Sequence, residues 1–327
     1  MEQLRYEFVL SAQSPIAHHS EVFGNNAVLM DRKIRQRDGS FVRVPIITAD
    51  TMRHGMREAA AYALLDAAGI LNAGGLGEAA LRLLFAGGMV TGRGDAGVIS
   101  LEQYRRMSDL IPSIALFGGC ADNRVIPGRL FVDDAQLVCS ETAHALPGWA
   151  SAWLAEQKTT LDTSRAHVEE VQRVRMDPTL DPGKRKLLSG GAEVEVVRRL
   201  TASEEGHVSG SAVTIEDSKS SMMPRRFETL VQGSFLYWSV HATCYSELDR
   251  DTFHVALASF LANAQVGGKR GTGHGRLRVE TARDVAVRRP AEQTNVLDLG
   301  KKMGTTFLDH VRKNATEIAA YLASVNA

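Results

Sequence analysis

The sequence has no excess of charge of either sign. Its 327 residues carry 38 lysines and arginines against 38 aspartates and glutamates. A neutral chain is not a polycation that coats nucleic acid through bulk charge, although a local basic groove offset by acids elsewhere stays open. With 44% hydrophobic and 23% charged residues, the composition is that of a folded protein and excludes wholesale disorder.

Long apolar runs and paired cysteines are also missing. The longest apolar stretches, 59–71 and 253–264, are short or interrupted by Asp66 or His254, and none reaches the ~20 residues of a membrane helix. The N-terminus lacks the apolar core of a signal peptide. Three widely spaced cysteines form no CxxC pair, which excludes a zinc knuckle and a disulfide framework. We therefore expect a cytoplasmic protein with no membrane partner, no metal and no cofactor.

The pattern of apolar residues predicts an α+β fold. Thr48 to Asp50 offers N-cap side chains directly before an Ala- and Leu-rich helix. The core order of strand, helix, strands, helix and strand is compatible with a ferredoxin-like (RRM-like) βαββαβ unit that carries large insertions. The expected strands cover 4–12, 27–35, 41–47, 128–138, a pair within 227–245, and 276–281, and the expected helices cover 52–68, 78–85, 101–110, 149–156, 253–264 and 305–325.

A polar segment interrupts this order. From about residue 160 to 223 large apolar residues are few, and 192–200 alternates like an exposed ribbon. We interpret the segment as an excursion from the core, formed by a long hairpin. The expected organisation is a core unit from 1–159 and 226–290 with inserted helical segments, an insertion at 160–225, and a C-terminal helix within 291–327.

Two short motifs resemble nucleotide-binding loops without the context that such loops need. Gly92 to Gly97 reads as GxGxxG, but the run before it is short and no long helix opens inside it. Gly268-Lys269 resembles the end of a phosphate loop, but Arg270 stands where Ser or Thr would bind magnesium. A surface loop is the better interpretation of 92–97, and an oxidoreductase using it stays a distant alternative.

A glycine-rich loop at Gly267 to Gly275 is the strongest candidate site. Glycines let backbone N–H groups line an anion-binding concavity, and two adjacent cations add charge to it. Residues 265–290 hold seven basic and two acidic residues, a balance of +5. A flexible turn with solvated charges is the alternative, and phosphate contact is favoured. The candidate RNA-binding residues here are Gly268, Lys269, Arg270, Gly271, Thr272 and His274.

A second basic block and a histidine pair lie near the N-terminus. Residues 30–57 carry seven basic and three acidic residues, and the first helix begins inside this block, where backbone N–H groups attract anions. An ordinary solvated helix face is the alternative. The candidates for phosphate contact are Arg35, Thr51, Arg53, His54 and Arg57 in the block, and His18, His19 and Ser20 in the loop that follows the first strand.

Four segments in order resemble the RAMP superfamily of CRISPR-associated proteins, and most of all the repeated guide-RNA-binding backbone subunit of Class 1 effector complexes. Residues 45–57 are similar to the motif that opens the family's first helix, with Thr51, Arg53 and Arg57 at its polar positions and departures at Thr48-Ala49 and His54. The other segments are 116–118 with 128–135, 227–236, and the loop 267–275. The long C-terminal helix and the loop departures look most like the type IV branch.

The resemblance implies a ferredoxin-like palm with a protruding β-hairpin thumb in the 160–225 insertion. Such subunits polymerise head to tail along a guide RNA (crRNA), hold its phosphates, and present it for pairing with a target nucleic acid. Recognition of this kind is not sequence-specific, because it uses the backbone and 2′-hydroxyls. The implied protein partners are other CRISPR effector subunits: a Cas five-like and a Cas six-like subunit, a large subunit and a helicase.

The insertion itself carries residues suited to RNA. Two methionines beside two arginines could wedge against a base while holding its phosphate. The alternative, that the two methionines are ordinary apolar residues where the chain returns to the hydrophobic core, explains them equally well. The candidate residues of this segment and its ends are Arg173, Arg175, Lys184, Lys186, Met222, Met223, Arg225 and Arg226.

The resemblance leaves a catalytic role open. In type III complexes the backbone subunit cuts target RNA with an acidic residue in the loop after the first strand. Here that loop offers only Glu21, beside His18 and His19, and an ordinary surface glutamate explains it better. We therefore expect a non-catalytic scaffold. The alternative is a RAMP endoribonuclease that cuts guide precursor or target RNA using His18, His19 or Glu21.

Overall fold

The computed structural model describes residues 1–23, 26–72, 76–88, 97–98, 100–121, 124–173, 187, 225–285 and 304–325. The chain forms two compact units. The first comprises Met1–Ser20, Leu29–Glu169 and Thr229–Ala327, and the second comprises Glu21–Val28 and Glu170–Glu228.

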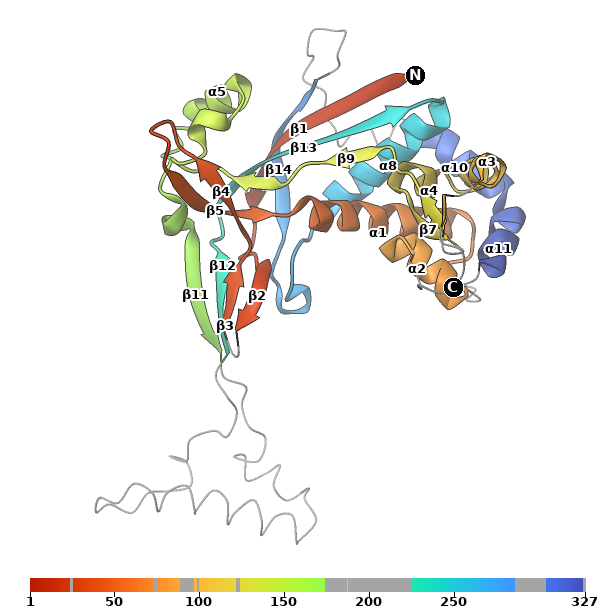
Figure 1. Ribbon diagram of the computed structural model, residues 1–327, viewed down its shortest axis with the longest axis horizontal. Coiled ribbons are helices and arrows are strands. Elements are labelled where there is room, and N and C mark those ends of the chain that lie inside the picture. Colours follow the sequence, from red (N-terminus) through yellow and green to blue (C-terminus); the bar gives the residue numbers. More distant parts are fainter. Residues whose placement is uncertain are drawn as a thin grey trace. The chain divides into compact units, whose positions relative to one another are not determined.

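The first unit is built on a sheet whose strand order is that of a ferredoxin-like fold. Its order is β14-β1-β13-β10-β5-β4, and the short strand β9 also pairs with β13 (Figure 1). Counting β9 and β10 as one strand, the core order is fourth, first, third, second, and these neighbours pair in antiparallel fashion. This confirms the predicted fold class. The bounds are β1 Glu2–Ala12, β4 Asp31–Arg35, β5 Phe41–Ile47, β9 Leu130–Val132, β10 Ala135–Leu137, β13 Phe235–Cys244 and β14 Leu277–Asp284.

Two helices, α1 (Ala49–Ala67) and α8 (Glu247–Ala262), pack against each other and against this sheet (Figure 1). The Thr48 side chain accepts a hydrogen bond from the Thr51 N–H, as the predicted N-cap requires. Ser246 and Asp249 form a capping box at the start of α8. Between the layers, Phe8 stacks on Trp238 with ring centroids 5.1 Å apart, and both side chains are fully buried.

A second apolar cluster joins the helices within 78–117 and 305–324 to α1 and α8. It includes Leu64, Leu83, Ile114, Phe307 and Ile318. The single C-terminal helix predicted over 305–325 is wrong in one respect, because Asn314 separates two helices. The bounds are α2 Glu78–Ala86, α3 Leu101–Leu110, α4 Pro112–Phe117, α5 Gly148–Glu156, α10 Thr305–Lys313 and α11 Ala315–Ser324, with a small sheet β6-β8-β7 formed by Gly97–Val98, Arg124–Ile126 and Gly119–Ala121.

The second unit contains most of a four-stranded sheet of order β11-β12-β3-β2. Its strands are β2 His19–Phe23, β3 Asn26–Leu29, β11 Val168–Arg173 and β12 Arg225–Leu230. The strand predicted over 27–35 is therefore two strands, and β3 pairs in parallel with β12. The two strands expected within 227–245 both form, but they belong to different sheets, because β13 pairs with β1 and β12 joins β11 and β3. The predicted division at 160–225 stays a prediction, since 174–186 and 188–224 lie outside the described residues.

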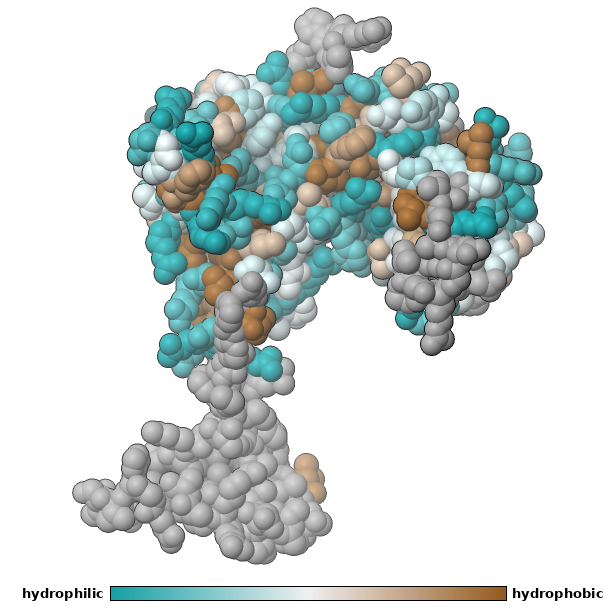
Figure 2. All heavy atoms as spheres, in the orientation of Figure 1, coloured by the Kyte–Doolittle hydropathy of each residue, from teal (hydrophilic) through white to brown (hydrophobic). Residues whose placement is uncertain are grey.

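Apolar side chains on the face drawn in Figure 2 form several separate groups among polar ones. Across the described ranges, no helix has the length and apolar character to cross a bilayer. Cys120, Cys139 and Cys244 are buried free thiols.

Candidate nucleic-acid interface

The glycine-rich loop between α8 and β14 is fixed to the segment after β1. The Gly268 N–H donates to the Ala17 carbonyl at 2.7 Å, and the Gly275 N–H donates to the Pro15 carbonyl at 2.9 Å. Gly267 has a φ of +75°, and a Cβ there would lie 2.6 Å from the Ala17 carbonyl oxygen. A side chain at Gly267 would therefore push the loop away from Ala17, in the segment that follows β1.

Hydrogen bonding within the loop occupies the N–H groups of its second half. The N–H groups of Thr272 and Gly273 donate to the carbonyls of Lys269 and Arg270. Lys269 itself has a left-handed φ of 58° and precedes a short 3₁₀ turn, Arg270–Thr272. Within the described ranges, no acceptor is found for the successive N–H groups of Arg270 and Gly271. These two donors are the part of the predicted anion-binding concavity that the structure supports.

The Arg270 side chain links this loop to α1. Its Nη1 lies 3.3 Å from the Glu58 carboxylate, and its Nε donates to the Gly267 carbonyl at 3.3 Å. The Arg270 side chain is 34% exposed, so solvent still reaches it. His274 is buried, and its Nδ1 lies 3.3 Å from the Thr272 carbonyl. Arg270 is thus positioned for a ligand, whereas His274 stabilises the loop.

His18 is held against the N-terminus of α1. The Thr48 N–H donates to His18 Nε2 at 3.3 Å, and the Thr48 hydroxyl lies 3.2 Å from the same nitrogen. Burial, followed by the neighbouring His19, lowers the pKa of His18. An accepting Nε2 and a lowered pKa both describe a neutral ring. The Asp134 carboxylate also accepts from the Ala49 N–H at 2.7 Å, so Thr48 and Asp134 already occupy donors of this helix end.

An open hollow of about 490 Å³ brings three of the predicted groups together. It is bounded by the residues after β1, by the first turn of α1 and by the glycine-rich loop. Arg270, His18, His19 and His54 supply groups that bind phosphate oxygens, and Asp50 is the acid among the lining residues. Its lining residues are Ala17, His18, His19, Asp50, Thr51, His54, Gly267, Gly268 and Arg270.

Arg53 and Arg57 point their guanidinium groups at backbone carbonyls. Arg53 Nη1 donates to the Leu130 carbonyl at 3.3 Å, and its Nη2 donates to the carbonyl of Phe117. Arg57 donates to the carbonyls of Gly118 at 2.9 Å and Phe117 at 3.2 Å. Burial lowers the pKa of Arg53 and lowers that of Arg57 to about 10. The geometry gives both arginines a structural role at the end of α4, and RNA contact by them stays a prediction.

The remaining candidates lie elsewhere. Arg35 is exposed at the end of β4, and Ser20 is exposed in β2. In the second unit, Arg173 lies over the Phe227 ring at 5.8 Å and Arg226 lies 3.9 Å from Glu170. Arg225 is exposed in β12. Arg175, Lys184, Lys186, Met222 and Met223 fall outside the described residues, as does Gly92–Ala96 of the GxGxxG motif.

The fold resembles that of a chain in a CRISPR complex. A solved structure described as "Type IV-B CRISPR Complex" matches with a TM-score of 0.53 and 20% sequence identity, over 91% of this chain and 98% of that chain. No protein-family model and no curated protein matches the sequence. At this identity the likeness shows the fold alone.

Sequence reasoning missed the residues that position this site. Glu58 was not singled out, although it lies one helical turn after His54 and holds Arg270. Asp134 was read as part of a strand motif, but it accepts hydrogen bonds from the helix start and from Arg32 at 3.1 Å. In the described part of the chain, no group of three or more histidines, cysteines and acids is arranged to hold a metal ion.

Proposed function

We propose that this chain is a non-catalytic, guide-RNA-binding subunit of a CRISPR effector complex. The observation that carries the proposal is the hollow in which Arg270, His18, His19 and His54 meet the glycine-rich loop, on a fold shared with a chain of a type IV-B CRISPR complex. The Arg270 guanidinium, the imidazole groups and the unpaired N–H groups at the loop tip suit the phosphate backbone of a single strand. Such contacts carry no sequence preference of their own.

Neutral total charge agrees with this function, because the basic residues are gathered locally. Lys269 and Arg270 lie on the glycine-rich loop that follows α8, whereas acids such as Glu247 and Asp249 lie at the start of that helix. RNA would be retained along the hollow and not over the whole surface.

In keeping with a filament subunit, we propose that copies associate head to tail and bind further effector subunits, and that the bound guide pairs with the target.

The test is RNA binding as a function of salt. The double variant Lys269→Glu/Arg270→Glu should weaken binding of any single-stranded RNA, and each lost phosphate contact should reduce the slope of log K against log salt by about 0.7. A matched control is Arg105→Glu/Arg106→Glu, because these arginines are exposed on α3 and line no part of the hollow. Equal binding by the wild-type chain and the loop variant would overturn the site.

The alternative function, an endoribonuclease, depends on His18, His19 or Glu21. His18 Nε2 already accepts the Thr48 N–H, which favours a structural role over proton transfer. Incubation of the purified chain with repeat RNA, and with guide-paired target RNA, separates the two functions. Specific cleavage that is lost in His18→Ala or Glu21→Ala would replace the scaffold with a nuclease.

Co-purification gives an independent check. A discrete RNA and other CRISPR effector subunits should accompany the tagged chain from its native cells. Recovery of the chain alone, with no nucleic-acid absorbance, would contradict the proposal.

A further inference from the structure

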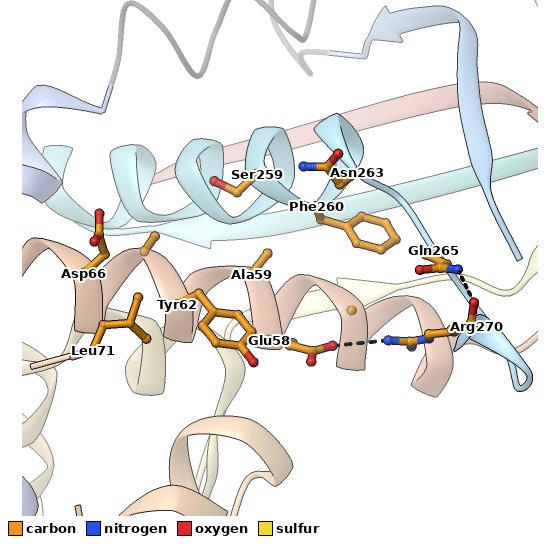
Figure 3. A pocket seen from close by; sticks show the side chains of 12 residues that line it. Glu58, Ala59, Tyr62, Asp66, Leu71, Ser259, Phe260, Asn263, Gln265 and Arg270 are labelled. Atoms are coloured by element: carbon orange, nitrogen blue, oxygen red, sulfur yellow. Dashed lines mark hydrogen bonds and ion pairs between the residues drawn. The ribbon is translucent and has the colours of Figure 1, made fainter. Parts of the chain in front are cut away.

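A groove between α1 and α8 adjoins the basic hollow and has no role in the function proposed above. It holds about 520 Å³, within the range of small-ligand pockets. Figure 3 shows Glu58 and Tyr62 on α1 facing the groove, with Ser259, Phe260 and Asn263 on α8. Its two ends differ: Gln265 and Arg270 lie at one, and Asp66 and Leu71 at the other (Figure 3).

The groove offers one half-exposed aromatic ring. Tyr62 is 49% exposed, and its ring meets Phe85 edge-on at a centroid distance of 5.1 Å. Phe85 thus supports the ring, while about half of the residue stays exposed. An exposed, supported aromatic ring is the surface on which nucleobases stack, and stacking tolerates every base.

Unused hydrogen-bonding groups line the rest of the groove. Within the described ranges, the side chains of Tyr62, Asp66, Ser259 and Asn263 make no hydrogen bond or ion pair. Asn263 ends α8 as its C-cap, so its position is fixed by the helix. Carboxylate and amide groups read the edges of bases, since the carboxylate accepts from exocyclic amines and the amide both donates and accepts.

Arg270 connects the groove to the basic hollow, because it lines both. On the groove side the Glu58 carboxylate lies 3.3 Å from the Arg270 guanidinium. Together with Asp66 this makes the groove a poor place for a phosphate and a good place for a neutral, polar ring. A nucleotide whose phosphate lies in the hollow could therefore reach the groove with its base.

We propose that this groove receives one unpaired nucleobase of the RNA held in the adjoining hollow, and that it prefers bases with an exocyclic amine over uracil. The proposal rests on the proposed RNA-binding function. Tyr62 supplies the stacking surface, and Asp66, one turn further along α1, supplies an acceptor for the amine. Uracil has no exocyclic amine, and its one donor on this edge, the N3–H, lies between two carbonyl oxygens that the Asp66 carboxylate repels.

The experiment compares short single-stranded RNA homopolymers of equal length, adenylate, cytidylate and uridylate, bound to the full chain at fixed salt. The adenylate and cytidylate strands should bind about fivefold or more tightly than uridylate. Tyr62→Ala should weaken their binding by about tenfold, while Tyr62→Phe should not. Ser259→Trp fills the groove without removing a contact, and it should abolish the preference among bases while leaving salt-sensitive binding intact. Phe131→Ala, at an exposed aromatic residue on β9, is the matched control.

The outcomes separate this inference from the function on which it rests. If no homopolymer binds in a salt-sensitive manner, the RNA-binding function fails and the groove proposal with it. If all three bind equally, and neither Tyr62→Ala nor Ser259→Trp changes their affinity, the hollow binds RNA and the groove proposal is wrong. If the groove variants alter only self-association, the groove is a protein-docking surface and the proposal is likewise wrong.

Discussion

Arg57→Met tests whether the arginines of α1 stabilise the fold or bind RNA. Arg57 donates to two buried carbonyls, those of Gly118 at 2.9 Å and Phe117 at 3.2 Å, and its guanidinium lies 5.4 Å from the Phe117 ring centroid. Methionine keeps the aliphatic stem and leaves the Gly118 carbonyl without this donor, whereas the Phe117 carbonyl still accepts from Arg53. At about 1–3 kcal/mol for one unsatisfied buried group, the free energy of unfolding should fall by about 1–3 kcal/mol.

The assay has two readouts on the same preparation. Urea denaturation should show a lower midpoint for Arg57→Met, while the RNA dissociation constant at fixed salt, measured where the variant is folded, should be unchanged. Arg35→Met is the matched control, because Arg35 is exposed at the end of β4; its stability should stay within about 0.5 kcal/mol of the wild type. Full stability of Arg57→Met combined with loss of RNA binding would refute the structural role.

Three further outcomes follow from single contacts. Burial lowers the pKa of His254 to about 4 from an ordinary 6.5, so the unfolded chain binds this proton at a higher pH than the folded chain does. The free energy of unfolding should therefore fall by about 3 kcal/mol as the pH drops from 6.5 to 4. A His254→Leu variant with the same pH profile as the wild type would contradict this. Gly267→Ala should weaken RNA binding severalfold, because the added Cβ meets the Ala17 carbonyl. Wild-type affinity in this variant would show that RNA binding does not depend on the contact between the loop and Ala17. Asp251→Ala removes the carboxylate that accepts from the Thr306 N–H at 3.1 Å and should destabilise α10 by about 1 kcal/mol, which hydrogen exchange of that helix would detect.

The sequence predicted the parts of the fold that depend on local pattern. Alternating Tyr6, Phe8 and Leu10 predicted β1, and Thr48 before an Ala- and Leu-rich run predicted α1 with its N-cap. Pairing between distant strands has no local signal, so the parallel partnership of β3 with β12 was not predicted. Asn314 is an ordinary helix residue by pattern, and only the structure shows the break there.

The candidate site divides in the same way. Clustering of glycines and cations located the loop, because both are visible as composition. The role of each polar group was not visible, because it depends on partners far apart in sequence. Glu58 holds Arg270 across 212 positions, and Arg57 reaches Gly118 across 61. The contact of His18 with Thr48 likewise joins two segments that sequence reasoning treated separately.

The position of β1 in the sheet has a consequence for synthesis of the chain. β1 is made first, yet both its neighbours, β13 at Phe235–Cys244 and β14 at Leu277–Asp284, are made more than two hundred residues later. At about 5–20 residues per second, β1 waits for roughly 10–50 s with two unpaired edges and an apolar face exposed. A nascent chain that stops before Phe235 cannot complete the central sheet, and aggregation through β1 is its expected fate.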